Sequence, residues 1–556
     1  MASRGGLEAL SAELFSEVIL YLPACQDRVS LSLVSKRLYD KVIPYIYGHW
    51  EFNGYDHSFQ SFYLFLRTMF ENRVLASHVQ SLDIQDWNMK RSDRLADEDD
   101  EYPNPAERLA HRSPEERARL ALQEEIQARR KAEKALLRQE LQRQEALEEE
   151  MYDQYIPFFR KSLDTMLVPQ AYSTKVGRFQ EYVNNRDPDI LLGVLTISLP
   201  NLATLYMTIP EELVGVLNTL AEFGGGLVPG ILENLNTIYV CSALYLGIKG
   251  HRQYHLELDT NISLFKIHGL RSLSILTAMG FNPFLTDLND KMVRELSRTS
   301  SLTDLAFDES LADPENIISI LSIPKSLRSL RWTQYFSCCN QIYFCTTPFY
   351  DNLGKSLIHH KETLEELDLD LRHVPCSVKG HAGNPHAKVE DMIEQVKEKW
   401  ENNCHLLGSL KEFSRLKRLK IGPEALCGNR PQGIAPARLP DSLPPSLEEL
   451  TLPFCFSVLQ DKRNTQLADQ IWIHELVYLV QNSASNLRNL RKITVLDWSP
   501  CLDRPQNGDW EIFKNVEIAS AEAGIEFLML NETSRWQTPV PYFLEILPTR
   551  NPGRDY

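Results

Sequence analysis

One short apolar pattern constrains the fold of this chain more than any other feature. The pattern reads apolar-x-x-Leu-x-apolar, and ten copies of it follow residue 190 in a chain of 556 residues. The central positions Leu205 and Leu528 are 323 residues apart over nine steps, which is about 36 residues per step. An eleventh copy, Val79/Leu82/Ile84, lies earlier. The ten copies are Leu202/Leu205/Met207, Leu235/Ile238/Val240, Leu270/Leu273/Ile275, Leu302/Leu305/Phe307, Leu327/Leu330/Trp332, Leu364/Leu367/Leu369, Leu416/Leu419/Ile421, Leu447/Leu450/Leu452, Leu490/Ile493/Val495 and Ile525/Leu528/Leu530.

Each copy predicts a short strand, and the segments between copies favour helices. Examples of such segments are 316–321 and 352–360, which read "NIISIL" and "NLGKSLIHH". A single strand–helix unit cannot cover its own apolar face, so the units must stack. We therefore expect an α/β solenoid of parallel strands and return helices over residues 151–535, with a first repeat-like unit at 51–89.

Stacked parallel strands place equivalent residues in rows, and the rows carry charge of alternating sign. Opposite charges suit neighbours that lie about 4.8 Å apart. One possibility is an internal ion-pair ladder formed by Arg331, Asp368 and Lys420. The alternative is that these three residues contact a ligand. Tyr206 and Tyr239 are predicted to contact a partner, because exposed aromatic residues contribute strongly to interfaces. The two rows read Asp304, Ser329, Glu366, Arg418, Glu449, Lys492 and Ala306, Arg331, Asp368, Lys420, Thr451, Thr494.

The first 50 residues predict a small helical unit of a different kind. Ser11 is placed to cap a helix that Pro23 ends, and Asp27 opens a second helix that Pro44 ends. About 45 residues bury little of their own surface, so this unit needs either the first repeat or a separate protein to cover it. The apolar positions are Leu14, Phe15, Val18, Ile19 and Leu22, then Val29, Leu31, Leu33, Val34 and Leu38.

The stretch "LEALSAELFSEVILYLPACQDRVSLSLVSKRLYDKVIPYIYGHW" resembles an F-box, which would span residues 7–50. Ser11 replaces the usual proline and Ser35 the frequent cysteine. With the repeats behind it, the chain resembles fungal F-box proteins with degenerate leucine-rich repeats. The matching positions are Leu10, Glu13, Leu14, Ile19, Leu22, Pro23, Leu31, Leu33, Val34, Lys36, Arg37 and Leu38.

The resemblance implies a role as the substrate receptor of an SCF-type ubiquitin ligase. In that class the F-box holds the Skp adaptor, which bridges to the cullin scaffold, and the repeats capture a protein substrate. Such a receptor is not an enzyme and needs no cofactor. The alternative is a scaffold protein that uses its repeats outside any ligase. By the resemblance, the adaptor-facing or F-box-core positions are Leu10, Leu14, Ile19, Leu22, Pro23, Leu31, Val34 and Leu38.

The repeats depart from the regular leucine-rich pattern in two ways. Their spacing exceeds the usual 20–29 residues. The Asn or Cys expected three positions after the last apolar residue occurs only as Cys455, and Ser310, Tyr335, Arg372 or Glu424 stands there in other copies. We therefore expect an irregular arc, because the asparagine ladder that braces even repeats is missing.

Residues 90–150 read as an acidic linker followed by a charged helix. Ser113, Pro114 and Glu116 form a capping box, and no Gly or Pro follows as far as Glu150. The apolar stripe is interrupted by Arg130 and Glu133, which predicts a long solvated helical insertion rather than a strong coiled coil. This insertion either binds a partner or is a charged helix stabilised only by its own ion pairs. The stripe comprises Leu122, Ile126, Leu137 and Leu141, and residues 536–556 form a C-terminal tail.

Composition excludes several classes of partner. The net charge is −16, from 75 acidic and 59 basic residues, which disfavours binding to nucleic acid or to an anionic membrane. The chain contains no apolar run of the roughly 18 residues that a membrane helix needs, and its start lacks the apolar core of a signal peptide. Ten unevenly spaced cysteines then predict reduced thiols in the cytoplasm, the nucleus or both.

Motifs that would indicate chemistry are incomplete. "LGKS" resembles a phosphate loop, but Phe349 stands five residues before Gly354, where that loop requires a glycine. The spacing of His373, Cys376, His381 and His386, with Cys404–His405 beyond, matches no common zinc module, and the group reads as a surface loop. We expect no catalytic constellation and no metal site.

Overall fold

The computed structural model describes two compact units, which are treated separately below. One comprises Met1–Leu235 with Ser242–Tyr254, and the other Asn236–Cys241 with His255–Tyr556. The described residues are 6–22, 25–53, 57–86, 125–126, 128–129, 131–133, 135–140, 142–143, 146–147, 150, 153–159, 161, 188–209, 220, 232–242, 256–257, 262–276, 278–279, 291, 293–310, 314–334, 350–370, 407–422, 425–426, 438–455, 473–498 and 513–531. Among them, no helix has both the length and the apolar character needed to cross a membrane.

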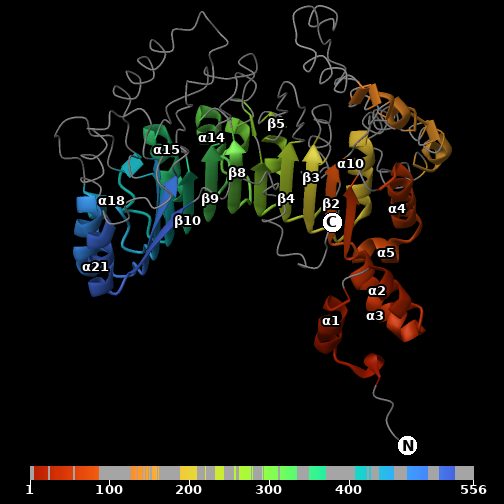
Figure 1. Ribbon diagram of the computed structural model, residues 1–556, viewed down its shortest axis with the longest axis horizontal. Coiled ribbons are helices and arrows are strands. Elements are labelled where there is room, and N and C mark those ends of the chain that lie inside the picture. The colour runs from red at the N-terminus through yellow and green to blue at the C-terminus, as the bar shows by residue number, and fades with distance from the viewer. Residues whose placement is uncertain are drawn as a thin grey trace, which may run out of the picture. The chain divides into compact units, whose positions relative to one another are not determined.

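The first unit is mixed α/β, with a parallel sheet in the order β1-β2-β3. Figure 1 shows α1, α2 and α3 grouped near the N-terminus, and α3 contacts both α5 and β1. The elements are η1 (Leu7–Ala9), α1 (Ala12–Leu20), α2 (Cys25–Ser32), α3 (Lys36–Tyr47), β1 (His49–Asn53), α4 (Phe59–Glu71), α5 (Arg73–His78), β2 (Ser81–Asp86), α10 (Pro188–Ser198) and β3 (Thr204–Ile209).

The second unit is a longer parallel sheet in the order β4-β6-β8-β9-β10-β11-β12-β13-β14. Figure 1 shows β8, β9 and β10 side by side. β5 (Leu256–Glu257) and β7 (Ala278–Met279) form a separate small sheet. The strands are β4 (Thr237–Ser242), β6 (Ser272–Leu276), β8 (Asp304–Ser310), β9 (Ser329–Gln334), β10 (Glu366–Asp370), β11 (Arg418–Ile421), β12 (Glu449–Cys455), β13 (Lys492–Trp498) and β14 (Glu526–Asn531). The helices are η4 (Ile262–Lys266), α14 (Pro314–Ile320), α15 (Tyr350–Leu357), η6 (Ile358–His360), α18 (Leu439–Ser442), α20 (Ser483–Asn486) and α21 (Lys514–Ala523).

The register of neighbouring strands is the one that the apolar pattern predicts. In the second unit, Leu330 pairs with Leu305 on one side and with Leu367 on the other. Just before the strand, the carbonyl of Thr303 accepts hydrogen bonds from the backbone N–H groups of Arg328 and Ser329, at 2.6 and 3.0 Å. The central residues of the other confirmed copies are fully buried or nearly so: Leu82, Leu205, Ile238, Leu273, Leu419, Leu450 and Ile493. The helices predicted at 316–321 and 352–360 are also present, as α14 and as α15 with η6.

The last copy of the pattern was predicted one residue out of register. Phe527 pairs with Ile493, so Leu528 and Leu530 lie on the opposite face of β14, where Leu530 is exposed. Just before this strand, Gly524 ends α21 with φ at +70° and donates its N–H to the carbonyls of that helix. The chain enters β14 at Glu526, one residue earlier than the apolar pattern implies.

Two expectations for the N-terminal helices were wrong, although Ser11 does cap α1 as predicted. The second helix is in fact two helices, because Ser35 caps α3 by accepting a hydrogen bond from the Leu38 N–H at 3.1 Å. Pro44 lies inside α3 and does not end it. The helix continues because burial of its Val42 and Ile43 side chains outweighs the backbone hydrogen bond that proline cannot make.

Strand β1 was not predicted and crosses the expected boundary at residue 50. Its Trp50 pairs with Leu82 of β2, and its Phe52 pairs with Ile84. The Trp50 ring stacks on Phe65 of α4, with centroids 4.0 Å apart and planes 2° from parallel. Trp50 stands at the central position, where the other copies carry leucine or isoleucine, so the pattern misses this strand.

Candidate functional site

Helices α1–α3 enclose a small core of their own. Its buried residues are Phe15 and Ile19 from α1 with Leu38 and Val42 from α3. Helices α1 and α3 each present an apolar stripe inward, as their sequence spacing requires, and α2 adds the partly buried Leu31. The partly buried residues packed against this core are Leu10, Leu22, Leu31, Tyr45 and Ile46.

Polar contacts fix the three helices against one another. The Lys41 ammonium donates to the carbonyls of Glu8 and Leu10 at 3.0 and 3.1 Å, and it lies 5.1 Å from the centroid of the Phe15 ring. The Ser35 hydroxyl hydrogen-bonds the Glu8 carboxylate. The Arg28 guanidinium of α2 makes a further contact of this kind, because it donates to the carbonyl of Leu22 at 2.9 Å.

Large apolar side chains nevertheless remain exposed on these helices and on the turns beside them. Leu14 is 57% exposed, Leu33 78% and Val34 70%. Single exposed apolar residues are ordinary, but several on one small unit indicate a binding surface. We call the following group the exposed apolar set of α1–α3: Leu7, Leu14, Leu20, Tyr21, Val29, Leu33, Val34 and Tyr39.

The structure separates the predicted adaptor positions into two kinds. Leu14 and Val34 belong to the exposed apolar set, whereas Pro23 lies outside the described residues. The other positions belong to the core of α1–α3 or pack against it: Leu10, Ile19, Leu22, Leu31 and Leu38. Sequence reasoning did not place Leu20, Tyr21 or Leu33 at a site. A signal was available for Leu33, since a helix places it on a different face from Leu31 and Val34, which lie three positions apart.

In the second unit, the predicted row Arg331–Asp368–Lys420 is ion-paired, but its partners differ in part from those expected. Arg331 donates through Nε and Nη2 to the two carboxylate oxygens of Asp308, at 2.7 and 2.5 Å. The Lys420 ammonium lies 3.2 Å from Asp370 Oδ2 and 3.6 Å from Asp368 Oδ1. Burial raises the pKa of Asp368 to about 6, although the Lys420 charge acts in the opposite direction.

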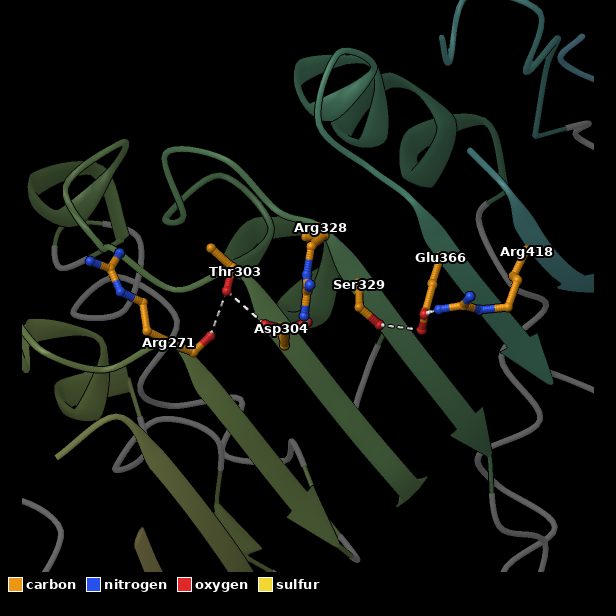
Figure 2. Close-up of polar contacts among 7 residues, drawn as sticks. All are labelled: Arg271, Thr303, Asp304, Arg328, Ser329, Glu366 and Arg418. Carbon is orange, nitrogen blue, oxygen red and sulfur yellow. Dashed lines mark hydrogen bonds and ion pairs between the residues drawn. The ribbon is translucent and has the colours of Figure 1, made fainter. Parts of the chain in front are cut away.

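In the row one position earlier, Glu366 pairs with Arg418 as alternating signs predict, whereas Asp304 pairs with Arg328, which lies outside that row (Figure 2). Arg328 donates to Asp304 at 3.0 Å, and the Thr303 hydroxyl donates to the same carboxylate at 2.7 Å. Ser329 donates to Glu366 at 3.3 Å, and Glu366 also pairs with Arg418. Further along the row, the Lys492 ammonium lies 3.8 Å from the Glu526 carboxylate. These pairs are partly or largely solvent-exposed and therefore add little to stability.

The structure describes some of the other predicted site residues but not all of them. Tyr206 lies on β3 and Tyr239 on β4, both half-buried, and they belong to different units, so their proximity remains a prediction. The histidine and cysteine group at 373–405 lies outside the described residues. Among the residues that are described, no group of three or more His, Cys, Asp or Glu side chains could hold a metal ion.

Comparison of the sequence with known proteins identifies no relative. No protein-family model matches the chain, and a search of curated proteins finds no match either.

Proposed function

We propose that this protein is the non-catalytic substrate receptor of an SCF-type ubiquitin ligase. In this proposal α1–α3 form an F-box that binds the Skp adaptor, and through it the cullin scaffold. The leucine-rich-repeat sheet binds the protein substrate. The observation that carries the proposal is the exposed apolar set of α1–α3, which lies in the F-box-like stretch and is left uncovered by the helices' own core.

The physical argument for adaptor binding is that the exposed apolar set of α1–α3 remains in contact with water. A Leu or Val side chain contributes about 1.5–3 kcal/mol when it moves from water into an apolar interface. Leu14, Leu33 and Val34 together would contribute part of the free energy of association, and the packed core of α1–α3 reduces the cost of ordering the surface. An adaptor with an apolar groove would cover these side chains.

The remaining parts of the proposal concern the substrate. The outward face of the second unit carries Arg331, Asp368 and Lys420, with ion pairs that a substrate could share. Tyr206 and Tyr239 are further candidates for contact with the substrate. Holding a substrate lysine close to a ubiquitin-loaded enzyme is a proximity effect, and it requires no catalytic residue in this chain. We place the protein in the cytoplasm, the nucleus or both.

Adaptor binding tests the proposal. We expect purified Skp adaptor to bind the full chain, and Leu14→Asp, Leu33→Asp and Val34→Asp each to weaken binding at least about tenfold, because each loses an apolar contact. Ile518→Asp is the matched control, since Ile518 is a half-exposed apolar residue on α21 of the second unit. Ile19 is unsuitable for this test because it is buried in the core of α1–α3. A folded wild-type chain that does not bind the adaptor would contradict the proposal.

The substrate is sought with the same variants. A chain that combines the three aspartate substitutions should still hold its substrate but no longer deliver it to the ligase. Affinity purification of this chain and of wild type, both under proteasome inhibition, should recover a shared protein whose lifetime lengthens when the gene is deleted. Adaptor binding without any such change in lifetime would favour the scaffold alternative.

A further inference from the structure

The outward face of the second unit, opposite the buried leucines of its strands, carries a group of charged side chains on β8–β11. Strand register places Arg331 of β9, Asp368 of β10 and Lys420 of β11 next to one another. Asp308 of β8 and Asp370 of β10 complete the group, because each pairs with one of the two bases. Asp308 and Asp370 are buried, whereas the Asp368 side chain is 30% exposed, so a partner can reach it.

Both bases of this group are engaged by carboxylates other than Asp368. The Arg331 guanidinium makes a bidentate pair with Asp308, through donors at 2.7 and 2.5 Å from the two oxygens. The Lys420 ammonium lies 3.2 Å from Asp370 but 3.6 Å from Asp368, beyond hydrogen-bond distance. Asp368 therefore lies between two cations and receives no hydrogen bond from either of them.

The Asp368 carboxylate lacks a hydrogen bond where a buried oxygen requires one. Its Oδ1 atom is buried and has no hydrogen-bond partner among the described residues. Buried polar atoms are nearly always hydrogen-bonded, because an unsatisfied one costs free energy. Burial raises the pKa of Asp368 to about 6, although the Lys420 charge opposes this shift. A carboxylate that is kept in the sheet at a cost to stability indicates a binding function.

The chemistry of this position favours a cationic partner. A lysine ammonium or an arginine guanidinium supplies the N–H donors that Asp368 lacks, and charge-assisted hydrogen bonds of this kind are strong. An anionic partner fits less well. It would have to displace Asp308 from Arg331 or Asp370 from Lys420, and it would be repelled by the Asp368 carboxylate.

We propose that Asp368 is the acceptor in a recognition site for a lysine or arginine side chain of a partner protein, which binds to the outward face of β9–β11. The pairs made by Arg331 and Lys420 leave this one carboxylate available to the incoming cation. The inference rests on the proposed function in one respect, since it takes the partner to be the ligase substrate. Its test uses no adaptor, so failure of this site and failure of adaptor binding are observed separately.

Peptide selection on the purified full chain tests the inference. A library of random peptides displayed on phage should yield, on wild type, peptides that share one Lys or Arg, and this preference should be absent on Asp368→Asn. Glu366→Gln is the matched control, because Glu366 is also an outward carboxylate of β10 but already pairs with Arg418. Both substitutions remove one negative charge. General attraction of basic peptides to an acidic chain therefore predicts equal effects, whereas a site at Asp368 predicts a loss in Asp368→Asn alone.

The affinity of one selected peptide then identifies the contact. Its shared basic residue is replaced by a neutral analogue, citrulline for arginine or acetyl-lysine for lysine. Binding measured by fluorescence anisotropy should weaken at least about tenfold on wild type and on Glu366→Gln, but less than about twofold on Asp368→Asn. Urea unfolding establishes that each variant is folded.

The affinity of wild type should also fall between pH 7.5 and 5, because protonation of Asp368 removes the charge that the cation needs. Arg331, Lys420, Asp308 and Asp370 face the same position, so the difference between wild type and Asp368→Asn isolates the contribution of Asp368. A wild-type chain that selects no peptide, or peptides that share an acidic residue, would overturn the inference. So would an equal loss of affinity on wild type and on Asp368→Asn when the basic residue is replaced.

Discussion

The backbone N–H of Leu327 donates a hydrogen bond of 3.1 Å to Nδ1 of His360. The other ring nitrogen, Nε2, lies 2.9 Å from the carbonyl oxygen of Leu321 and donates to it. The imidazole is thus neutral, with its proton on Nε2, and it is 1% exposed. His360 precedes β10 and bonds the backbone on both sides of the turn that leads into β9, so it braces two consecutive repeats where an asparagine ladder is missing.

Replacing this histidine should destabilise the second unit. His360→Ala leaves the Leu327 N–H and the Leu321 carbonyl buried without a partner and opens a cavity. We expect the free energy of unfolding to fall by about 2–4 kcal/mol in urea titrations. His359→Ala is the control, since His359 is exposed and should change stability by less than about 0.5 kcal/mol. Equal losses in the two variants would contradict the bracing role.

The same histidine should make stability depend on pH. Burial lowers the pKa of His360 below its ordinary value of 6.5; the hydrogen bond to the Leu321 carbonyl opposes this shift, and the charges of Arg298 and His359 add to it. The unfolded chain therefore binds the proton first, and stability is lost as pH falls from about 6.5 towards the lowered pKa. The neutral variant His360→Gln lacks this titration. We expect the stability advantage of wild type over His360→Gln to shrink between pH 7.5 and 5, as measured by urea unfolding at each pH.

Much of the sheet could be predicted from the sequence because one buried position per repeat dominates it. Leu305, Leu330 and Leu367 recur in a fixed relation to each strand, and burial on one face leaves no alternative register. The prediction failed where something other than leucine periodicity sets the geometry. β14 begins one residue earlier than leucine periodicity implies, just after the left-handed helix end at Gly524, and Trp50 fills the central leucine position in β1.

The site was harder to predict than the fold, for a physical reason. A leucine in an F-box-like stretch reads the same whether it faces the core or the solvent, so Ile19 and Leu14 could not be told apart. Only packing shows that Ile19 is buried and Leu14 exposed. In the ion-paired row, the strand position of Arg331 was predicted, but its partner Asp308 lies outside the predicted row, at a position that long side chains can reach.

Two arginine–aspartate pairs on adjacent strands should differ in strength because their burial differs. In the Arg331–Asp308 pair, the arginine side chain is 37% exposed and the aspartate 9%. In the Arg328–Asp304 pair, the corresponding values are 58% and 26%. Arg331→Gln leaves a buried carboxylate without its bidentate partner and should cost about 2–4 kcal/mol. Arg328→Gln should cost about 0–1 kcal/mol. Urea unfolding of both variants checks the contrast, which equal values would refute.

Asp368 should give the opposite pH dependence to His360. Its pKa is raised from 3.8 to about 6, so the folded chain holds the proton more tightly than the unfolded chain does. This group therefore lowers stability as pH rises from about 4 to 6, and it remains unfavourable above that range. Asp368→Asn removes the titration. Relative to wild type, we expect this variant to gain stability between pH 4.5 and 7.5, by up to about 3 kcal/mol. A difference that does not vary with pH would exclude this role for the carboxylate.

Gly354, in the "LGKS" stretch, is required by packing against the backbone. A Cβ atom at this position in α15 would collide with the carbonyl oxygen of Leu407, which lies 53 residues further along the chain. Backbone cannot move aside as a flexible side chain can, so Gly354→Ala should destabilise the second unit by about 3 kcal/mol. Gly408→Ala meets no neighbouring atom and should cost only about 1–2 kcal/mol, from its φ of +92°. Lys355→Ala, which removes only an exposed pair with Asp351, should change stability by less than about 1 kcal/mol. Thermal and urea unfolding of the three variants should rank them in this order, and a Gly354→Ala chain as stable as wild type would show that the close approach to Leu407 does not constrain the fold.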